Sequence, residues 1–237
     1  MSKRNYNIKT MRKLFYLLPL LIIFLSCQSK KEEKQSPDRF IRVEGPDLIK
    51  PDGKKFLIQG INLGNWLNPE GYMFFFQDAS SYRLINEAFC EMVGPDFTNW
   101  FWNEFKKNYI TEEDIKYIKQ TGMNSVRIPF HYKLFTNEDY MGQASDHDGF
   151  GMIDQVVEWC RQEGLYVILD MHDAPGGQTG DNIDDSYGYP WLMESEPSKE
   201  LFCNIWKKVA EHYANDTIIL GYDLLNEPIA HYFLEEY

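Results

Sequence analysis

Residues 111–130 read TEEDIKYIKQTGMNSVRIPF, a predicted helix followed by a predicted strand. Thr111 and Asp114, three residues apart, resemble a capping box that begins a helix. Gly122 is placed to end that helix, because glycine readily adopts the left-handed conformation found after helix C-termini. The largely apolar run at 124–130 then predicts a strand. The stretch is therefore one helix–strand unit of an α/β protein.

The same unit repeats along the chain. Each helix shows apolar residues three and four positions apart, and a short apolar strand follows it. Alternation of this kind indicates parallel strands joined by right-handed crossovers. The predicted elements are a first buried strand with its outgoing loop at 59–66, a helix at 111–122, and strands at 124–130, 166–172 and 218–222 separated by helices at 153–164 and 198–214.

Two architectures accept this order, a doubly wound open sheet and a closed (β/α)8 barrel. No glycine-rich phosphate loop follows any predicted strand, which counts against the nucleotide-binding open sheets. The sequence therefore favours an α/β fold of the (β/α)8 TIM barrel type, of which this chain holds the first four βα units. Two runs at 40–43 and 55–58 flank the turn signal Pro51-Asp52-Gly53 and predict a small β-hairpin before the barrel.

The N-terminus has the features of a secretory signal. Five basic residues precede an apolar run at 14–25, which is followed by Ser26 and Cys27. Residues 24–27 resemble the lipobox of bacterial lipoproteins. The resemblance implies a signal peptide at 1–27, a lipid on Cys27 and anchoring in the outer membrane of the bacterial cell envelope, at its periplasmic face or at the cell surface. Residues 28–38 predict a flexible tether. An uncleaved signal anchor is the alternative.

Charge and cysteine content count against a nucleic-acid partner, a disulfide framework and a zinc site. The chain has 24 basic and 36 acidic residues, and without the five basic residues of the signal it has 19 against 36, a charge near −17. Such a surface repels phosphate backbones, so nucleic acid is not an expected partner and neutral substrates such as sugars fit better. Cys90, Cys160 and Cys203 predict neither a disulfide framework nor a zinc site. Cys160 and Cys203 fall on apolar faces of predicted helices and are expected in the core.

Polar residues collect where the predicted strands end. Asn65 and Trp66 follow the first strand, Arg127 lies on the second, His172 ends the third, and Asn226-Glu227 follow the fourth. Because the carboxyl ends of parallel strands meet at one crevice, Glu227 is the expected catalytic acid, and Asn65 and Trp66 are expected to bind the sugar substrate. Each residue also has a structural interpretation: a strand cap for Glu227, an ion pair for Arg127 and a core imidazole for His172.

The strand-end residues belong to four motifs, which are Gly60-Ile61-Asn62-Leu63-Gly64-Asn65-Trp66, Val126-Arg127-Ile128-Pro129, Leu169-Asp170-Met171-His172-Asp173-Ala174-Pro175-Gly176-Gly177-Gln178 and Leu225-Asn226-Glu227-Pro228. In order and spacing they resemble glycoside hydrolase family 5, the cellulase-like (β/α)8 glycosidases, over residues 40–230. The resemblance implies a retaining β-glycosidase that uses no metal or other cofactor.

By the same resemblance, four residues receive catalytic roles. Glu227 is the general acid/base, Asn226 hydrogen-bonds the sugar 2-hydroxyl, His172 lines the same subsite, and Arg127 orients the nucleophilic carboxylate. These roles suit the chemistry, because a retaining glycosidase needs two carboxyl groups that titrate at different pH, and an arginine beside one of them lowers its pKa.

The loop at 174–182 resembles that of exo-β-1,3-glucanases and β-glucosidase-like members, which implies a β-glucan polysaccharide or oligosaccharide as substrate. Asp173, Asp181 and Asn182 are candidate sugar contacts there, with solvated loop residues as the alternative. Endo or exo action and the oligomeric state stay open.

The sequence departs from the family pattern in one respect. The family's nucleophile is a glutamate that follows the seventh strand, and no such strand is found after Glu227. Glu235 and Glu236 follow Glu227 too soon to come from another strand. We therefore expect residues 39–237 to be the N-terminal half of a catalytic domain, inactive and unstable alone because its sheet edges would be open.

Two other functions stay open. A metal-dependent hydrolase would use His172, Asp173 and Glu227, although no second histidine has ligand spacing. The other is a surface lipoprotein that only binds glycans and carries a decayed catalytic half.

Overall fold

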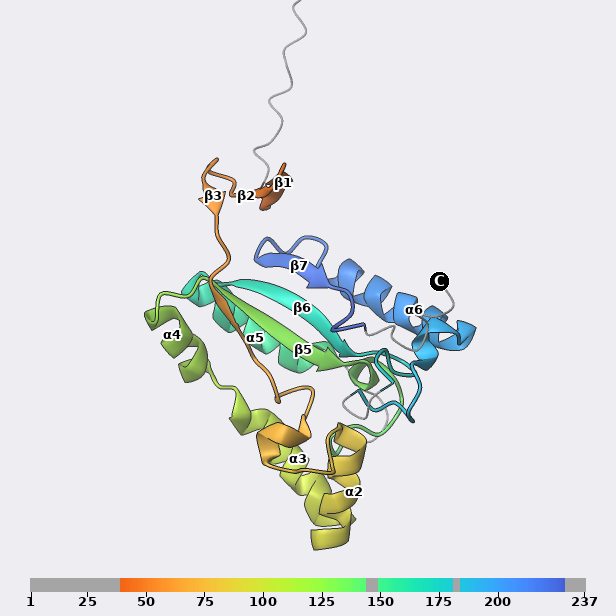
Figure 1. The fold of residues 1–237 in the computed structure, drawn as a ribbon. Coiled ribbons are helices and arrows are strands. Elements are labelled where there is room, and N and C mark those ends of the chain that lie inside the picture. The colour runs from red at the N-terminus through yellow and green to blue at the C-terminus, as the bar shows by residue number, and fades with distance from the viewer. Residues whose placement is uncertain (1–38, 144–148, 181–183, 229–237) are drawn as a thin grey trace, which may run out of the picture. The chain divides into compact units, whose positions relative to one another are not determined.

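The structure, a computed structural model, describes residues 39–143, 149–180 and 184–228. Its main element is a parallel sheet in the order β4-β5-β6-β7, which is also the order along the chain (Figure 1). Sequential parallel strands joined by helices are the arrangement from which a (β/α)8 barrel is built, so the described sheet agrees with part of such a barrel. The strands are β4 (Gly60–Asn62), β5 (Ser125–His131), β6 (Tyr166–Asp173) and β7 (Ile219–Asp223).

The start of α4 and the end of α5 lie where the sequence predicts, whereas α5 begins three residues before the predicted 153 and α6 begins and ends two residues before the predicted 198 and 214. The capping box is present, since the Asp114 carboxylate accepts a hydrogen bond from the Thr111 N–H at 2.8 Å and the Thr111 side chain accepts one from the Asp114 N–H. Gly164 ends α5 in the left-handed conformation. In Figure 1, α5 and α6 lie against the same face of the sheet. The helices are α4 (Glu112–Gln120), α5 (Phe150–Glu163) and α6 (Glu196–His212).

The aromatic segment between β4 and α4 folds as two further helices. The fully buried ring of Trp102 has its centroid 5.5 Å from that of Phe89, 5.7 Å from Phe105 and 6.0 Å from Phe74. These aromatic rings therefore pack against one another in the core of this segment. The remaining helices of the described chain are α2 (Tyr82–Val93), α3 (Pro95–Tyr109) and the short 3-10 helices η1 (Gly71–Phe74), η2 (Tyr132–Phe135) and η3 (Trp191–Met193).

The predicted N-terminal hairpin is wrong in its pairing. β1 (Arg42–Glu44) pairs with β2 (Asp47–Ile49), and β2 pairs with β3 (Lys55–Phe56), so the element is a three-stranded antiparallel sheet. The physical reason is a tight turn at Gly45, whose φ of 61° suits glycine and returns the chain to β1 at once.

Two predictions of burial are also wrong. The first strand was expected to be buried, but β4 lies at the edge of the described sheet, pairs there with β5 alone, and leaves Ile61 44% exposed. Cys203 was expected in the core with Cys160, but only Cys160 is buried and Cys203 is exposed. α6 instead buries Ile205, Trp206 and Val209, a stripe that excludes position 203.

The two faces of the sheet differ in polarity. Along β6, Val167, Leu169 and Met171 are buried in the hydrophobic core, whereas Asp170 and His172 alternate with them and point to the other face. Register places Asp223 of β7 beside Asp170. The face turned away from α5 and α6 therefore carries polar groups toward the carboxyl ends of the strands.

The signal peptide, Cys27 and the tether lie outside the described residues, and the domain boundaries remain predictions. In the part of the chain that the structure describes, no helix has the length and apolar character needed to cross a bilayer.

Truncation of α5 tests the core assignment. Ile153 is 1% exposed, so Ile153→Ala leaves a cavity and should lower the free energy of unfolding of the complete protein by about 2–5 kcal/mol, measured by urea denaturation. Gln155 lies exposed on the same helix, and Gln155→Ala should change it by less than about 0.5 kcal/mol. Equal losses for the two variants would contradict the assignment.

Candidate active site

The Arg127 side chain connects the ends of several strands. Its Nη2 lies 2.8 Å from Asp223 Oδ2 and 3.0 Å from Asp170 Oδ2, and it donates to Asn226 Oδ1 at 2.9 Å. Its Nη1 donates to Asn62 Oδ1 at 3.2 Å. Guanidinium is planar, always charged and purely a donor, so it can hold several oxygen acceptors in fixed directions.

His172 is held in one orientation by the carboxylate of Asp170. His172 Nδ1 lies 2.7 Å from Asp170 Oδ2, which assigns the Nδ1 proton to that hydrogen bond. Nε2 is then free to accept, and Asn226 Nδ2 lies 3.4 Å from it. Burial raises the pKa of Asp170, while His172 and Arg127 oppose that rise. Asp170 therefore positions both the imidazole and the guanidinium.

Asn226 and Glu227 follow β7 by three residues. The Asn226 N–H donates to Met171 O at 3.2 Å, which holds the segment against β6, and Glu227 has a φ of 41° in the left-handed region. Glu227 lines a polar cavity of about 230 Å³ together with Asn62, Glu70, Tyr72, Arg127, His172, Asp173, Gln178, Thr179, Asp184 and Asn226. The cavity thus contains the expected acid and its three expected partners.

Glu70 is a site residue that the sequence did not single out. It comes from the loop after β4, and its Oε1 lies 3.9 Å from His172 Nε2. Burial raises the pKa of Glu70, and the nearby His172 opposes the rise. The position of Glu70 could not be predicted from the first motif, which ends at Trp66, because its partner His172 comes from another strand.

A second cluster lies buried behind the cavity. His131 Nδ1 accepts the Lys133 N–H at 3.1 Å, so the imidazole proton is on Nε2, which lies 3.2 Å from Asp185 Oδ2. Burial lowers the pKa of His131 to about 4, so the ring is neutral at neutral pH. Burial alone would raise the pKa of Asp185, but the hydrogen bond from His131 and the charge of Lys133 outweigh it and lower that pKa.

Asp173 belongs to this buried cluster. Its carboxyl is 2% exposed, and Oδ2 lies 3.3 Å from His131 Nε2 without forming a hydrogen bond. Burial raises the pKa of Asp173 well above its usual range, and the negative charge of Asp185 adds to the rise. Its interpretation as a solvated loop residue is wrong, because β6 extends to Asp173 and carries its side chain inward.

The predicted roles of Trp66 and Asn65 do not fit the structure. Trp66 is 2% exposed and its Nε1 donates to Lys106 O at 2.8 Å, so its ring belongs to the core and does not face sugar. Asn65, at φ 63°, is 3% exposed and accepts the Glu70 N–H at 2.9 Å. Asn65 therefore shapes the loop that carries Glu70. Asp181 and Asn182 lie outside the described residues.

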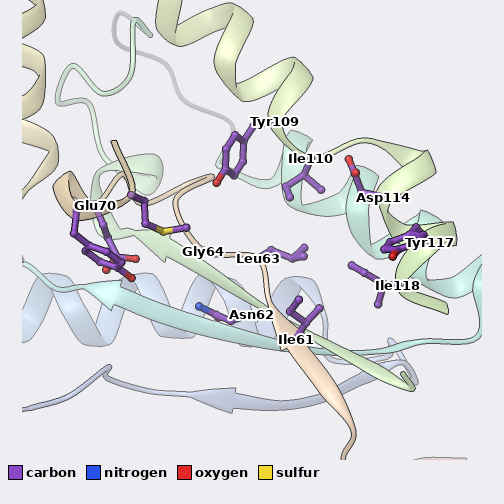
Figure 2. Close-up of a pocket in the computed structure, with 12 residues that line it drawn as sticks. Ile61, Asn62, Leu63, Gly64, Glu70, Tyr109, Ile110, Asp114, Tyr117 and Ile118 are labelled. Atoms are coloured by element: carbon purple, nitrogen blue, oxygen red, sulfur yellow. The ribbon is translucent and has the colours of Figure 1, made fainter. Parts of the chain in front are cut away.

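A less polar hollow adjoins the cavity, and Figure 2 shows the residues around it. It has a volume of about 420 Å³, lies along the exposed edge of β4 between η1 and α4, and shares Asn62, Glu70 and Tyr72 with the polar cavity. Its other walls are mostly apolar, so the acid–base groups are concentrated in the smaller cavity. Among the described residues, no three His, Cys, Asp or Glu side chains are grouped to hold a metal ion.

The burial of Asp173 predicts a pH dependence of stability. Because burial raises the pKa of Asp173 in the folded state, its carboxyl loses its proton at higher pH there than in the unfolded chain, where it ionises above about pH 4. Folding then takes up a proton, so stability falls as pH rises through this window. Asp173→Asn removes this proton uptake, so the stability of the variant relative to the native protein should rise by up to about 1.4 kcal/mol per pH unit from about pH 4 up toward the raised pKa.

Urea denaturation at several pH values measures this difference. The matched control is Asp78→Asn, at an exposed position, which should leave the slope unchanged. A constant difference between Asp173→Asn and the native protein at all pH values would show that Asp173 is ionised when folded.

The comparisons with known proteins agree with this geometry. The sequence model described as "Cellulase (glycosyl hydrolase family 5)" matches residues 86–232. The chain is 30% identical over 190 residues to a protein named beta-xylosidase from Phanerodontia chrysosporium, covering 80% of this chain and 39% of that protein. It is 31% identical over 170 residues to endoglucanase C from Acetivibrio thermocellus, covering 72% of this chain and 40% of that protein.

A solved structure supports the same fold. The crystal structure of rutinosidase from Aspergillus niger superposes with a TM-score of 0.59 at 20% identity, over 73% of this chain and 49% of that one. The chain thus spans about two fifths of the curated relatives it matches and about half of this structure. With a family match over residues 86–232 and a sheet of parallel strands joined by helices, the chain belongs to glycosyl hydrolase family 5, and its fold is part of a (β/α)8 barrel.

Proposed function

We propose that the complete domain hydrolyses O-glycosidic bonds of a β-linked glycan with retention of configuration, and that Glu227 is its general acid/base. The observation that carries the proposal is the placement of Glu227 in a polar cavity, directly after Asn226, whose amide is oriented by Arg127 and His172. Because Arg127 can only donate, it must face Asn226 Oδ1. The Asn226 NH₂ is then the group available to a sugar hydroxyl.

A retaining site also needs a second carboxylate, the nucleophile. It must be ionised and lie about 5 Å from the acid/base. Glu70 and Asp173 line the same cavity, but burial raises the pKa of both, which disfavours the ionised form. Asp184 also lines it, but it is 2% exposed and its carboxylate accepts the N–H groups of Gln178, Thr179 and Ser186. We therefore propose that the nucleophile is supplied after a later strand of the barrel, as in the family pattern. The role of Arg127 toward that nucleophile stays a prediction.

We propose a β-glucan as the substrate. Relatives are named beta-xylosidase, endoglucanase C and glucan 1,3-beta-glucosidase, so two of the three names refer to a β-linkage and two to a glucan. The walls of the cavity are rich in hydrogen-bonding groups, including the amides of Asn62 and Asn226, which suits a neutral polyhydroxylated ligand. Linkage and the choice between endo and exo action need assays on a panel of oligosaccharides.

Substitution of the acid tests the proposal. Glu227→Gln removes the proton donor, so kcat/KM on a β-glucosyl disaccharide should fall about 10²–10⁴-fold in the complete protein. Dinitrophenolate leaves without protonation, so kcat/KM on dinitrophenyl β-glucoside should fall by less than about 10-fold. Nuclear magnetic resonance should show the β-anomer as the first product.

The matched control is Glu91→Gln on α2, an exposed position, which should not change either rate. Unchanged hydrolysis by Glu227→Gln would contradict the assignment of the acid/base. Binding of β-glucan without turnover by the native complete protein would instead favour a glycan-binding function.

We also propose that the protein is a lipoprotein of the bacterial envelope, anchored through Cys27. The support is the lipobox-like sequence at 24–27 and the polar stretch after it. Cys27→Ser should abolish incorporation of labelled fatty acid and move the protein out of the detergent-extracted membrane fraction. Unchanged labelling of that variant would show that the lipid is attached elsewhere.

A further inference from the structure

Gln178 connects the two strand ends that carry the candidate catalytic residues. It is 1% exposed and lies in the loop that follows β6. Its Nε2 donates to His172 O at 2.6 Å and to Asn226 O at 3.0 Å. Its Oε1 accepts the Ala174 N–H at 3.1 Å, which fixes which end of the amide faces the two carbonyl groups.

The hydrogen bond to Asn226 O acts on the peptide group that precedes Glu227. The carbonyl oxygen of one residue and the nitrogen and Cα of the next lie in one plane, because the peptide bond is planar. Anchoring Asn226 O therefore restricts the position of the Glu227 Cα and the direction of its side chain. The other side of Asn226 is held by its N–H, which donates to Met171 O at 3.2 Å.

The conformation of Glu227 makes this support necessary. Its φ of 41° lies in the left-handed region, which costs a residue with a side chain about 1–2 kcal/mol. Such a conformation persists only when surrounding contacts hold it. Gln178 supplies one of these contacts from a separate loop, so the geometry of the acid depends on a side chain that need not touch substrate itself.

We infer that Gln178 is a positioning residue for the general acid, which it controls through the Asn226–Glu227 peptide plane. The inference rests on the proposed function and deepens it. A glutamine is suited to the position because it has two N–H donors for two carbonyl oxygens and one acceptor for Ala174. Glutamate has nearly the same shape, but when ionised it has no donor and would repel both carbonyl oxygens.

The experiment compares two leaving groups in the complete protein. For Gln178→Glu, kcat/KM on the β-glucosyl disaccharide should fall about 10–100-fold, because small misplacement of a catalytic group has large kinetic effects. The loss on dinitrophenyl β-glucoside should stay below about 3-fold, since that substrate does not need the acid. The disaccharide activity should recover partly at lower pH, where the introduced carboxyl is protonated and donates again.

Two further variants keep the test decisive. Gln178→Met, which has similar length and no donors, should show the same selective loss without the recovery at low pH. Asp185→Asn loosens the same loop by weakening its contacts with His131 and Lys133, and it should reduce the two rates equally.

The inference is overturned if Gln178→Glu and Gln178→Met retain the native leaving-group ratio, whether activity is kept or lost equally on both substrates. It is also overturned if Asp185→Asn is as selective as the Gln178 variants, because the effect would then belong to the loop. The Glu227→Gln variant distinguishes failure of the proposed function from failure of the positioning role alone. If Glu227→Gln lacks leaving-group selectivity, the proposed function itself fails, whereas selectivity there but not at Gln178 rejects only the positioning role.

Discussion

The candidate site depends on the guanidinium of Arg127. From β5 it reaches Asn62 at the end of β4, Asp170 on β6, and Asp223 and Asn226 at the end of β7. Removal of a partner from a partly buried ion pair is costly, because the remaining charge is left in a poorly solvated place. The positive charge also makes it possible to place Asp170 at 0% exposure beside His172. Strand register alone would bring these side chains near one another, but the hydrogen bonds to the Arg127 guanidinium fix their orientations.

Two carboxyl groups three residues apart on β6 lie in different surroundings. Asp170 faces Arg127, whereas Asp173, three residues later, joins His131 and Asp185 in a buried cluster. In that cluster the positive charge of Lys133 favours ionisation of Asp185 and leaves Asp173 with the cost of burial. The two carboxyl groups of this short segment therefore lie in different surroundings, although both belong to β6.

The sequence was sufficient for the part of the fold that periodicity and capping control. α4, α5 and the strands after them lie where their apolar patterns predict, and Arg127, His172, Asn226 and Glu227 share one cavity because parallel strands end at one edge. Trp66 was misjudged because proximity to a strand end does not tell which way an indole points; its N–H donates to Lys106 O within the core. Glu70 and Asp223 were missed because their partners come from other strands. Asp170 could have been predicted as a site residue, because it lies two positions before His172 on the same strand and therefore on the same face.

The contacts that orient Glu227 are made largely by the backbone of Asn226. The Asn226-Glu227 motif therefore depends on residues of other strands and loops. Asn226 uses its side chain to contact Arg127 and His172, its N–H to contact Met171 and its carbonyl oxygen to contact Gln178. The side chain, the N–H and the carbonyl oxygen of Asn226 are therefore all held by hydrogen bonds. These contacts keep the next residue, Glu227, in the left-handed conformation. A catalytic carboxyl on a long, flexible side chain gains precision when its own Cα is fixed, because fewer torsions remain to be ordered on reaching the transition state. The loop after β6 thus contributes to the geometry at the end of β7.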